Sequence, residues 1–272
     1  MNKAEQNAAL RCAVAAARAA GALMRRNLTA TKTVNLRATH DIKLELDVRC
    51  QRLIERRLSR DFPAIAVLGE EGESGLADAP ARWVIDPIDG TVNFAYGIPH
   101  ACVCIALQVR SRSRTAQMDG GYETIVGVVY DPFMDELWSA TAGDVARLNG
   151  KPIRVSTRAR LSDAISAMGY GKNEKTMAIA LKLFRNLSRR SRKVRNMGAA
   201  GLALAYVATG RFDAYIERGI SIWDIAAGGF IVERAGGEFW RERLRDGSGY
   251  RMIASNGRLR RQIESLHETR RA

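Results

Sequence analysis

The chain has 272 residues, of which 46% are hydrophobic, and carries a formal net charge of +14 at pH 7. This length and composition allow a sizeable core in one or two domains. No apolar stretch reaches the roughly 18 residues that a membrane-spanning helix needs, and charges interrupt the Ala-rich start where a signal peptide needs an unbroken apolar run. We therefore expect a cytoplasmic protein without membrane insertion.

The first elements can be predicted from periodicity. Residues 4–28 predict an amphipathic helix, because apolar residues recur near helical spacing and Ala dominates. Residues 41–47 alternate like an edge strand, and a helix is predicted over 48–58. The apolar runs 65–68 and 83–85 predict strands with turn signals after them. Glu70 and Asp86 then follow the carboxyl ends of strands, where sites form in open α/β sheets.

From residue 101 the chain becomes strand-rich and then helical. A largely antiparallel meander is predicted over 102–109, 125–130 and 136–140. The basic segment 110–124 is too long for a tight hairpin, so we expect a mobile surface loop there. Later elements are helices over 174–188, 199–209 and 221–235 and strands over 214–216 and 252–254. Without a linker between the halves, we expect two tightly packed subdomains, residues 1–145 and residues 146–272.

Charge and cysteines give weaker indications. The segment 182–195 holds seven basic residues and no acid. Such a balance favours phosphate-bearing partners, nucleic acid or an anionic membrane surface, although a solvated basic face is the plainer interpretation. The four cysteines lack zinc-type spacing, and Cys102-Val-Cys104 lies in a run typical of a buried strand. We expect four reduced thiols in the core.

Chemistry is most clearly indicated by the segment Trp83-Val-Ile-Asp86-Pro-Ile-Asp89-Gly-Thr91. Its proline fixes one φ and its glycine permits a tight turn, so that one rigid corner presents both carboxylates. Glu70 in Gly69-Glu-Glu-Gly72 and Asp224 in the segment 222–228 could join them. Such oxygen ligands suit Mg²⁺, and two ions sharing them could activate water and steady the leaving oxygen of a phosphate ester.

Each of these motifs has an ordinary structural interpretation. Asp-Pro and Asp-Gly form turns, and Ser221-x-x-Asp224 fits a helix capping box. The occurrence of all three segments in order favours the functional interpretation. Ile88-Asp89-Gly90-Thr91-Val92 also superficially matches a haloacid dehalogenase motif. Because Pro87 stands where that chemistry needs an aspartate nucleophile, we expect no covalent intermediate.

Together the three segments resemble the inositol monophosphatase family. The resemblance covers about residues 41–256, and further matching segments are Gly127-Val-Val-Tyr-Asp131-Pro, Asn149-Gly150, Val207-Ala-Thr-Gly210 and Ala254-Ser-Asn256. It implies an α/β fold with the layered αβαβα sandwich shared with fructose-1,6-bisphosphatases. It also implies a homodimer, dependence on two or three Mg²⁺ ions, and lithium sensitivity.

The resemblance also implies roles for individual residues. The implied metal ligands are Glu70, Asp86, the backbone carbonyl of Ile88, Asp89 and Asp224. Glu70 and Thr91 would hold the attacking water as catalytic residues, and Asp47 would support the metal waters. The implied substrate-binding residues are Gly90, Thr91, Gly198, Ala199, Ala200, Glu217 and Asp224, with Gly90 and Thr91 at the phosphate and Glu217 at sugar hydroxyls.

The chain departs from the family pattern ahead of the acidic segments. Leu36 precedes Arg37 where the family often has a lysine, and Leu44 replaces a hydroxyl-bearing residue near the presumed third metal. These departures concern the weakest metal site and leave the two-metal core unchanged. Arg37, Lys43 and Glu45 are candidate substitutes.

The resemblance makes hydrolysis of a small phosphate monoester the leading hypothesis, with inositol-1-phosphate or a related polyol or sugar phosphate as substrate. Histidinol phosphate, fructose-1,6-bisphosphate and 3′-phosphoadenosine 5′-phosphate are alternatives. The string Gly90-Thr91-Val92-Asn93-Phe94 looks like the inositol and fructose-bisphosphate groups rather than the nucleotide-cleaving members. An alternative of another class is a binding factor for RNA or a nucleic-acid machine. No aromatic residues interleave the arginines of the basic segment, so we expect this role to be accessory at best.

Overall fold

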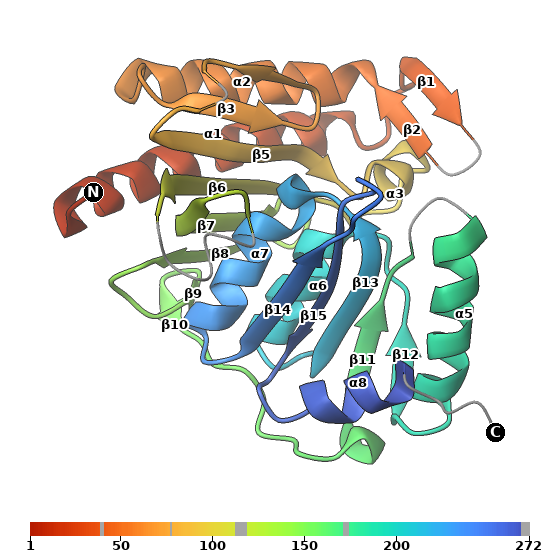
Figure 1. Cartoon of the computed structure of the whole chain (residues 1–272). Coiled ribbons are helices and arrows are strands. Elements are labelled where there is room, and N and C mark those ends of the chain that lie inside the picture. Colours follow the sequence, from red (N-terminus) through yellow and green to blue (C-terminus); the bar gives the residue numbers. More distant parts are fainter. Residues whose placement is uncertain (39–40, 77, 112–118, 171–173, 268–272) are drawn as a thin grey trace.

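The computed structural model describes residues 1–38, 41–76, 78–111, 119–170 and 174–267. Its helices and sheets alternate in five layers, as the view in Figure 1 shows. This arrangement confirms the predicted αβαβα sandwich. Within the described residues, no helix combines the length and apolar character needed to cross a membrane.

The larger sheet has eight strands in the order β10-β9-β8-β7-β6-β5-β3-β4. Strands β3 and β5 are parallel, and the other neighbours are antiparallel, which confirms the predicted meander. The strands are β3 (Ala66–Gly69), β4 (Gly72–Ser74), β5 (Ala81–Asp89), β6 (Cys102–Arg110), β7 (Tyr122–Asp131), β8 (Glu136–Thr141), β9 (Arg147–Leu148) and β10 (Lys151–Pro152).

Two helices, α1 (Lys3–Asn27) and α2 (Glu45–Asp61), cover the outer face of this sheet. The buried face of α1 is built mainly from alanines, which let the helix lie close to the strands. Gly21 shows how close this contact is, because a Cβ there would come 2.5 Å from the ring of Tyr130 on β7. The packing of α1 is therefore sensitive to any added volume on this face.

The smaller sheet has five strands in the order β12-β11-β13-β15-β14. Its strands are β11 (Ile165–Met168), β12 (Lys193–Arg195), β13 (Ala214–Ile220), β14 (Glu238–Arg243) and β15 (Tyr250–Ser255). Helices α6 (Ala200–Ala208) and α7 (Ile222–Arg234) fill the space between the two sheets, and α5 (Glu174–Ser188) and α8 (Arg260–His267) cover the outer face. The remaining elements are the hairpin β1 (Val34–Ala38) and β2 (Asp41–Leu44), the short helix α3 (Thr91–Ala95) and a 3-10 turn (Leu161–Asp163).

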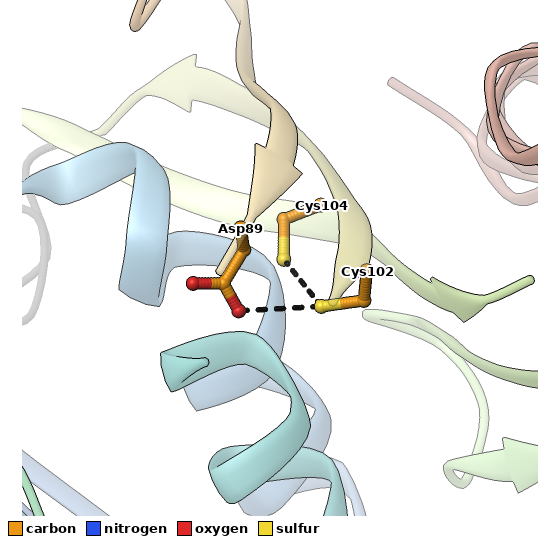
Figure 2. A group of neighbouring side chains, drawn as sticks. All are labelled: Asp89, Cys102 and Cys104. Atoms are coloured by element: carbon orange, nitrogen blue, oxygen red, sulfur yellow. Dashed lines mark hydrogen bonds between the residues drawn. The ribbon is translucent and has the colours of Figure 1, made fainter. Parts of the chain in front are cut away.

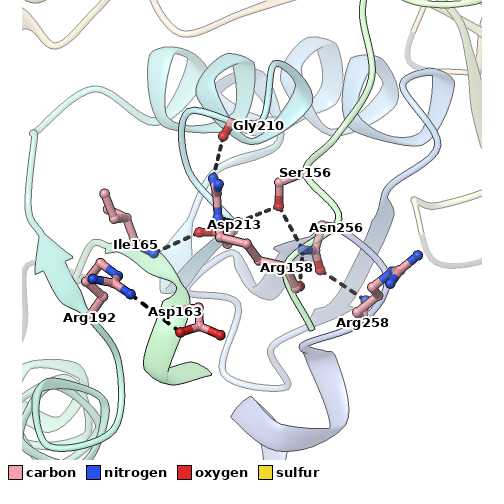
Figure 3. Close-up of polar contacts among 9 residues, drawn as sticks. All are labelled: Ser156, Arg158, Asp163, Ile165, Arg192, Gly210, Asp213, Asn256 and Arg258. Atoms are coloured by element: carbon pink, nitrogen blue, oxygen red, sulfur yellow. Dashed lines mark hydrogen bonds and ion pairs between the residues drawn. The ribbon is translucent and has the colours of Figure 1, made fainter. Parts of the chain in front are cut away.

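A buried acid fixes one end of the smaller sheet (Figure 3). Asp213, just before β13, accepts hydrogen bonds from the backbone N–H of Ile165 at 2.8 Å and from Nε of Arg158 at 2.8 Å, and also from the hydroxyl of Ser156. The side chain of Asn256 after β15 donates to the Ser156 hydroxyl at 2.9 Å. These bonds join β11, β13 and β15 at the end where β13 begins.

Most predicted helices and strands agree with the observed ones, but three predictions need correction. Residues 45–47 were predicted as strand, whereas α2 already begins at Glu45. The alternation was misleading because Asp47 accepts a hydrogen bond from the Leu44 N–H at 2.7 Å and so caps this helix. Asp86 lies within β5, which continues to Asp89, and not beyond it. The predicted loop over 110–124 is shortened by β6 and β7, and residues 112–118 lie outside the described residues.

Candidate active site

The end of β5 forms a sharp corner that carries two acids. Asp86 pairs with Cys104 and Asp89 with Cys102 on β6, so β5 has one extra residue between these pairs, which is a β-bulge. The Asp86 carboxylate accepts the N–H of Ile88 at 3.0 Å, which fixes the bulge. Gly90 follows with φ of +88°, and a Cβ there would lie 2.9 Å from a backbone carbonyl, so glycine is required at this turn.

Two further acids reach this corner, one from the helical layer between the sheets and one from a turn of the same sheet. Asp224 is in the first turn of α7, and its carboxylate accepts the N–H of Ser221 at 2.8 Å. Oxygen atoms of Asp86, Asp89 and Asp224 lie within 4.8 Å of one another. Glu70 lies in the turn between β3 and β4, and its N–H donates to the carbonyl of Ile85 on β5 at 3.1 Å. Asp224 thus caps its helix and belongs to the acidic cluster at the same time.

Burial and mutual repulsion raise the pKa values of these acids. Burial, followed by the charges of Asp224 and Glu71, raises the pKa of Glu70 to about 7. Burial and the charge of Asp89 raise the pKa of Asp224 to about 7, and burial raises the pKa of Asp86 well above its usual value. Neighbouring carboxylates repel one another when they are ionised, and a nearby cation stabilises their ionised form. The cluster offers only hard oxygen donors, so it fits Mg²⁺.

A pocket of about 820 Å³ opens over the acids. It is lined by every predicted site residue except Asp47: Glu70, Asp86, Ile88, Asp89, Gly90, Thr91, Gly198, Ala199, Ala200, Glu217 and Asp224. Asp47 is only 2% exposed, and its Oδ1 has no hydrogen-bond partner among the described residues. Burial, together with the charges of Glu70 and Glu71, raises its pKa to about 7. Asp47 therefore lies close to the acids but outside the lining.

Asp89 connects β5 to the predicted substrate turn. Its Oδ1 accepts the N–H of Ala200 at 3.0 Å, and its Oδ2 accepts the N–H of Gly201 at 2.7 Å, so Asp89 caps α6. The Cys102 thiol also donates to Oδ2 at 3.3 Å and lies 3.8 Å from the sulfur of Cys104 (Figure 2). Burial raises the pKa of the Cys102 thiol well above its usual value, which keeps the thiol protonated as a donor.

The substrate turn is also held by Asn93 on α3. The Asn93 amide donates to the carbonyls of His100 and Met197, each at 2.9 Å. Gly198 has φ of +72°, a backbone conformation that favours glycine. The hydroxyl of Thr91 donates to the carbonyl of Ile88 at 2.8 Å, so these two predicted site groups contact each other.

Glu217 reaches the pocket from the smaller sheet and contacts a residue that the sequence analysis missed. The hydroxyl of Tyr215 donates to its carboxylate, and burial raises the pKa of Glu217 to about 7. Both residues lie on β13, where residues two apart share a face, so strand alternation around Glu217 is the signal that could have identified Tyr215. Gly169 lies so close that a Cβ there would be 2.0 Å from Oε2 of Glu217.

The residues that depart from the family pattern lie in different parts of the structure. Leu44 is fully buried in the core beneath the larger sheet and does not line the pocket. Lys43 does line the pocket, and its ammonium group donates to the Glu71 carboxylate at 2.9 Å. Glu45 is exposed on α2, and the side chains of Leu36 and Arg37 are outside the described residues. Of the two candidate substitutes whose side chains the structure describes, Lys43 is the one at the pocket.

Fold and site together define a layered α/β protein with a buried acidic, metal-compatible pocket between its two sheets. Comparison with known proteins identifies the class more closely. A sequence profile of the inositol monophosphatase family matches residues 5–271, and the chain belongs to that family.

Individual relatives agree with this assignment. The chain is 38% identical over 236 residues to Nus factor SuhB of Xylella fastidiosa, covering 85% of this chain and 81% of the relative. It is 36% identical over 233 residues to inositol monophosphatase 1 of Solanum lycopersicum, covering 83% and 81%. The crystal structure of extragenic suppressor protein suhB from Bartonella henselae is similar, with a TM-score of 0.86, 32% identity and coverage of 96% and 99%.

Proposed function

We propose that the protein hydrolyses small phosphate monoesters with Mg²⁺, and that inositol-1-phosphate or a related polyol or sugar phosphate is its substrate. The observation that carries the proposal is the cluster of Asp86, Asp89 and Asp224, whose oxygens lie within 4.8 Å of one another in the pocket that Glu217 also lines. Membership of the inositol monophosphatase family supports the same reaction, and the tomato relative is named for it.

Each side chain then has a defined task. The residues that hold two or three Mg²⁺ ions are Glu70, Asp86, the carbonyl of Ile88, Asp89 and Asp224. Bound Mg²⁺ supplies positive charge that makes a water more acidic and steadies the oxygen that leaves phosphorus. Glu70 and Thr91 would orient that water for in-line attack, and Asp47, which interacts electrostatically with Glu70, would support the waters on the ions. Gly90 and Thr91 donate hydrogen bonds to the phosphate. Because water is the nucleophile, and Pro87 stands where an aspartate nucleophile would be needed, no side chain becomes covalently phosphorylated.

Substrate choice follows from the groups opposite the acids. The buried Glu217 carboxylate can accept hydrogen bonds from two hydroxyls of a polyol ring, while the turn of Gly198, Ala199 and Ala200 packs against the ring. A second phosphate, as in 3′-phosphoadenosine 5′-phosphate, would be repelled by Glu217 unless a cation compensated it. Among the described residues that line the pocket, Lys43 is the only basic one, and it is already paired with Glu71. These contacts favour polyol monophosphates.

The test is phosphate release from a panel of monoesters in Mg²⁺, in chelator, and in Mg²⁺ with lithium. We expect inositol-1-phosphate to be preferred, with loss of activity in chelator and inhibition by lithium. Asp89→Asn should abolish turnover in a protein that stays folded, with a lower melting temperature because the amide cannot accept from both Ala200 and Gly201, whereas the exposed Asp144→Asn should retain turnover. Unchanged turnover in Asp89→Asn, or a preference for 3′-phosphoadenosine 5′-phosphate at equal low concentrations, would overturn this assignment.

We also propose a homodimer, as the family resemblance implies, which analytical ultracentrifugation can test. Several relatives are named Nus factor SuhB, and the exposed basic residues on α5 and β12 leave an accessory nucleic-acid role as a second candidate. A filter-binding salt titration with RNA tests it, because phosphate contacts make affinity fall steeply with salt. Binding that is weak and independent of salt would exclude this role.

A further inference from the structure

Asp89 belongs to two separate groups of possible metal ligands. The first is the all-oxygen group with Asp86 and Asp224, to which the proposed function assigns Mg²⁺. The second joins Asp89 to the thiols of Cys102 and Cys104, and its three ligand atoms also lie within 4.8 Å of one another. One carboxylate therefore belongs both to a hard-donor group and to a soft-donor group, the second of which is drawn in Figure 2.

The spacing of the second group matches tetrahedral coordination by a thiophilic ion. With Zn–S bonds of about 2.3 Å and a Zn–O bond of about 2.1 Å, a tetrahedral site has S···S and S···O edges of about 3.8 Å and about 3.6 Å. The observed edges are 3.8 Å between the two sulfurs and 3.3 Å between Cys102 and Asp89. The third edge, between Cys104 and Asp89, is within 4.8 Å.

The surroundings keep the two sulfurs on this side of the strand. Cys102 and Cys104 are two residues apart on β6, so both side chains leave the same face toward Asp89. Gly201 on α6 packs directly against both thiols, since a Cβ there would come 2.4 Å from the Cys104 sulfur and 3.0 Å from that of Cys102. Both thiols are fully buried, and of the three ligand residues Asp89 is the one that lines the pocket.

We propose that Asp89, Cys102 and Cys104 form a site for a thiophilic divalent cation of the Zn²⁺ or Cd²⁺ class. Binding replaces two S–H bonds by two metal–sulfur bonds and releases two protons to solvent, without any change of oxidation state. The Asp89 carboxylate supplies the third ligand. Because soft cations prefer thiolates and Mg²⁺ prefers oxygen, the site distinguishes these ions by donor type.

Occupation of this site has a consequence for the acidic cluster. The ion draws Asp89 toward β6 and adds a positive charge beside the group that holds Mg²⁺. Zn²⁺ and Cd²⁺ therefore inhibit the phosphatase reaction by binding the thiols, a consequence that rests on the proposed function. Binding itself does not depend on the proposed activity and is measured separately.

The binding experiment titrates Cd²⁺ into the metal-free protein carrying Cys12→Ala and Cys50→Ala, so that Cys102 and Cys104 are the remaining thiols. We expect an ultraviolet cadmium–thiolate charge-transfer band that saturates at one ion and two released protons per chain. Cys104→Ala in this background should abolish the band and weaken Cd²⁺ binding at least about 100-fold. Far-ultraviolet circular dichroism checks that each variant is folded.

Two results would overturn the proposal. One is the absence of a thiolate band in a folded protein that retains Cys102 and Cys104, and the other is an equal band in the Cys104→Ala variant. A Cys102→Ala variant provides a second test if Cys104→Ala does not fold. In Mg²⁺-dependent assays, Cys104→Ala should raise the inhibitory Cd²⁺ concentration at least about 10-fold. If no phosphatase activity exists, the proposed function fails while the band still reports the site.

Discussion

Displacing Glu217 without removing its charge gives a sharp test of substrate recognition. In Gly169→Ala, the new Cβ would lie 2.0 Å from Oε2 and 2.3 Å from Cδ of Glu217, whereas real Cβ atoms stay at least 3.0 Å from other atoms. The carboxylate must therefore retreat by about 1 Å, and a displacement of that size costs on the order of 100-fold in rate at an ordered site. We expect kcat/KM for inositol-1-phosphate to fall by about that factor.

The assay compares inositol-1-phosphate with p-nitrophenyl phosphate, whose leaving group has no polyol hydroxyls. Turnover of the second substrate should stay within about threefold, because the acids of β5 and α7 are untouched. Gly143→Ala is the matched control, since a Cβ at Gly143 meets nothing within 4 Å. If Gly169→Ala is folded and hydrolyses inositol-1-phosphate at the normal rate, Glu217 does not recognise the polyol.

Three further predictions concern stability and catalysis. In chelator, stability should fall as pH rises from about 4 to about 8, because the raised pKa values of Glu70 and Asp224, each about 7, mean that the folded chain binds more protons than the unfolded one. Each group contributes on the order of 3 kcal/mol to this loss of stability, and added Mg²⁺ should reduce the loss. A melting temperature that rises with pH in chelator would contradict the prediction. Thr91→Ala should lower kcat more than it raises KM, and a change confined to KM would remove Thr91 from water positioning. Arg241 forms a buried ion pair with Asp119, with Nε 2.9 Å from Oδ1. Arg241→Ala leaves Asp119 buried without its partner, so in thermal denaturation it should lower the stability by about 3–5 kcal/mol and the melting temperature by about 10 °C. The double variant Asp119→Asn and Arg241→Met removes both charges and should be less destabilised.

The sequence allowed prediction of features whose signals are local. The helix over 174–188 agrees with α5, and the layered fold followed from the family resemblance. The acids at positions 70, 86, 89 and 224 occur in distinctive strings, and the structure brings them into one pocket. Their roles as ligands remain predictions. The capping box at Ser221 was also visible, because it depends on a spacing of three residues along one helix.

Features that depend on pairing between distant segments were not predictable. The contact of Asp89 with Cys102 requires the register between β5 and β6 and the bulge before Asp89, neither of which has a signal along the chain. The same holds for the hydrogen bonds from Ala200 and Gly201 to Asp89, which span more than a hundred residues. Residues 45–47 were misassigned for a different reason, since a polar and apolar alternation is compatible with a capped helix start.

The position of α6 and α7 between the two sheets means that no continuous part of the chain contains the whole pocket. Glu70, Asp86 and Asp89 belong to the larger sheet, Asp224 to the middle layer, and Glu217 to the smaller sheet. A nascent chain that has folded only its first 150 residues or so therefore holds three of these acids and lacks the other two. An ion held by these acids would connect the larger sheet to α7. Its binding free energy would then stabilise the packing of the layers against one another and not one local element. Metal affinity should therefore weaken when the layers separate.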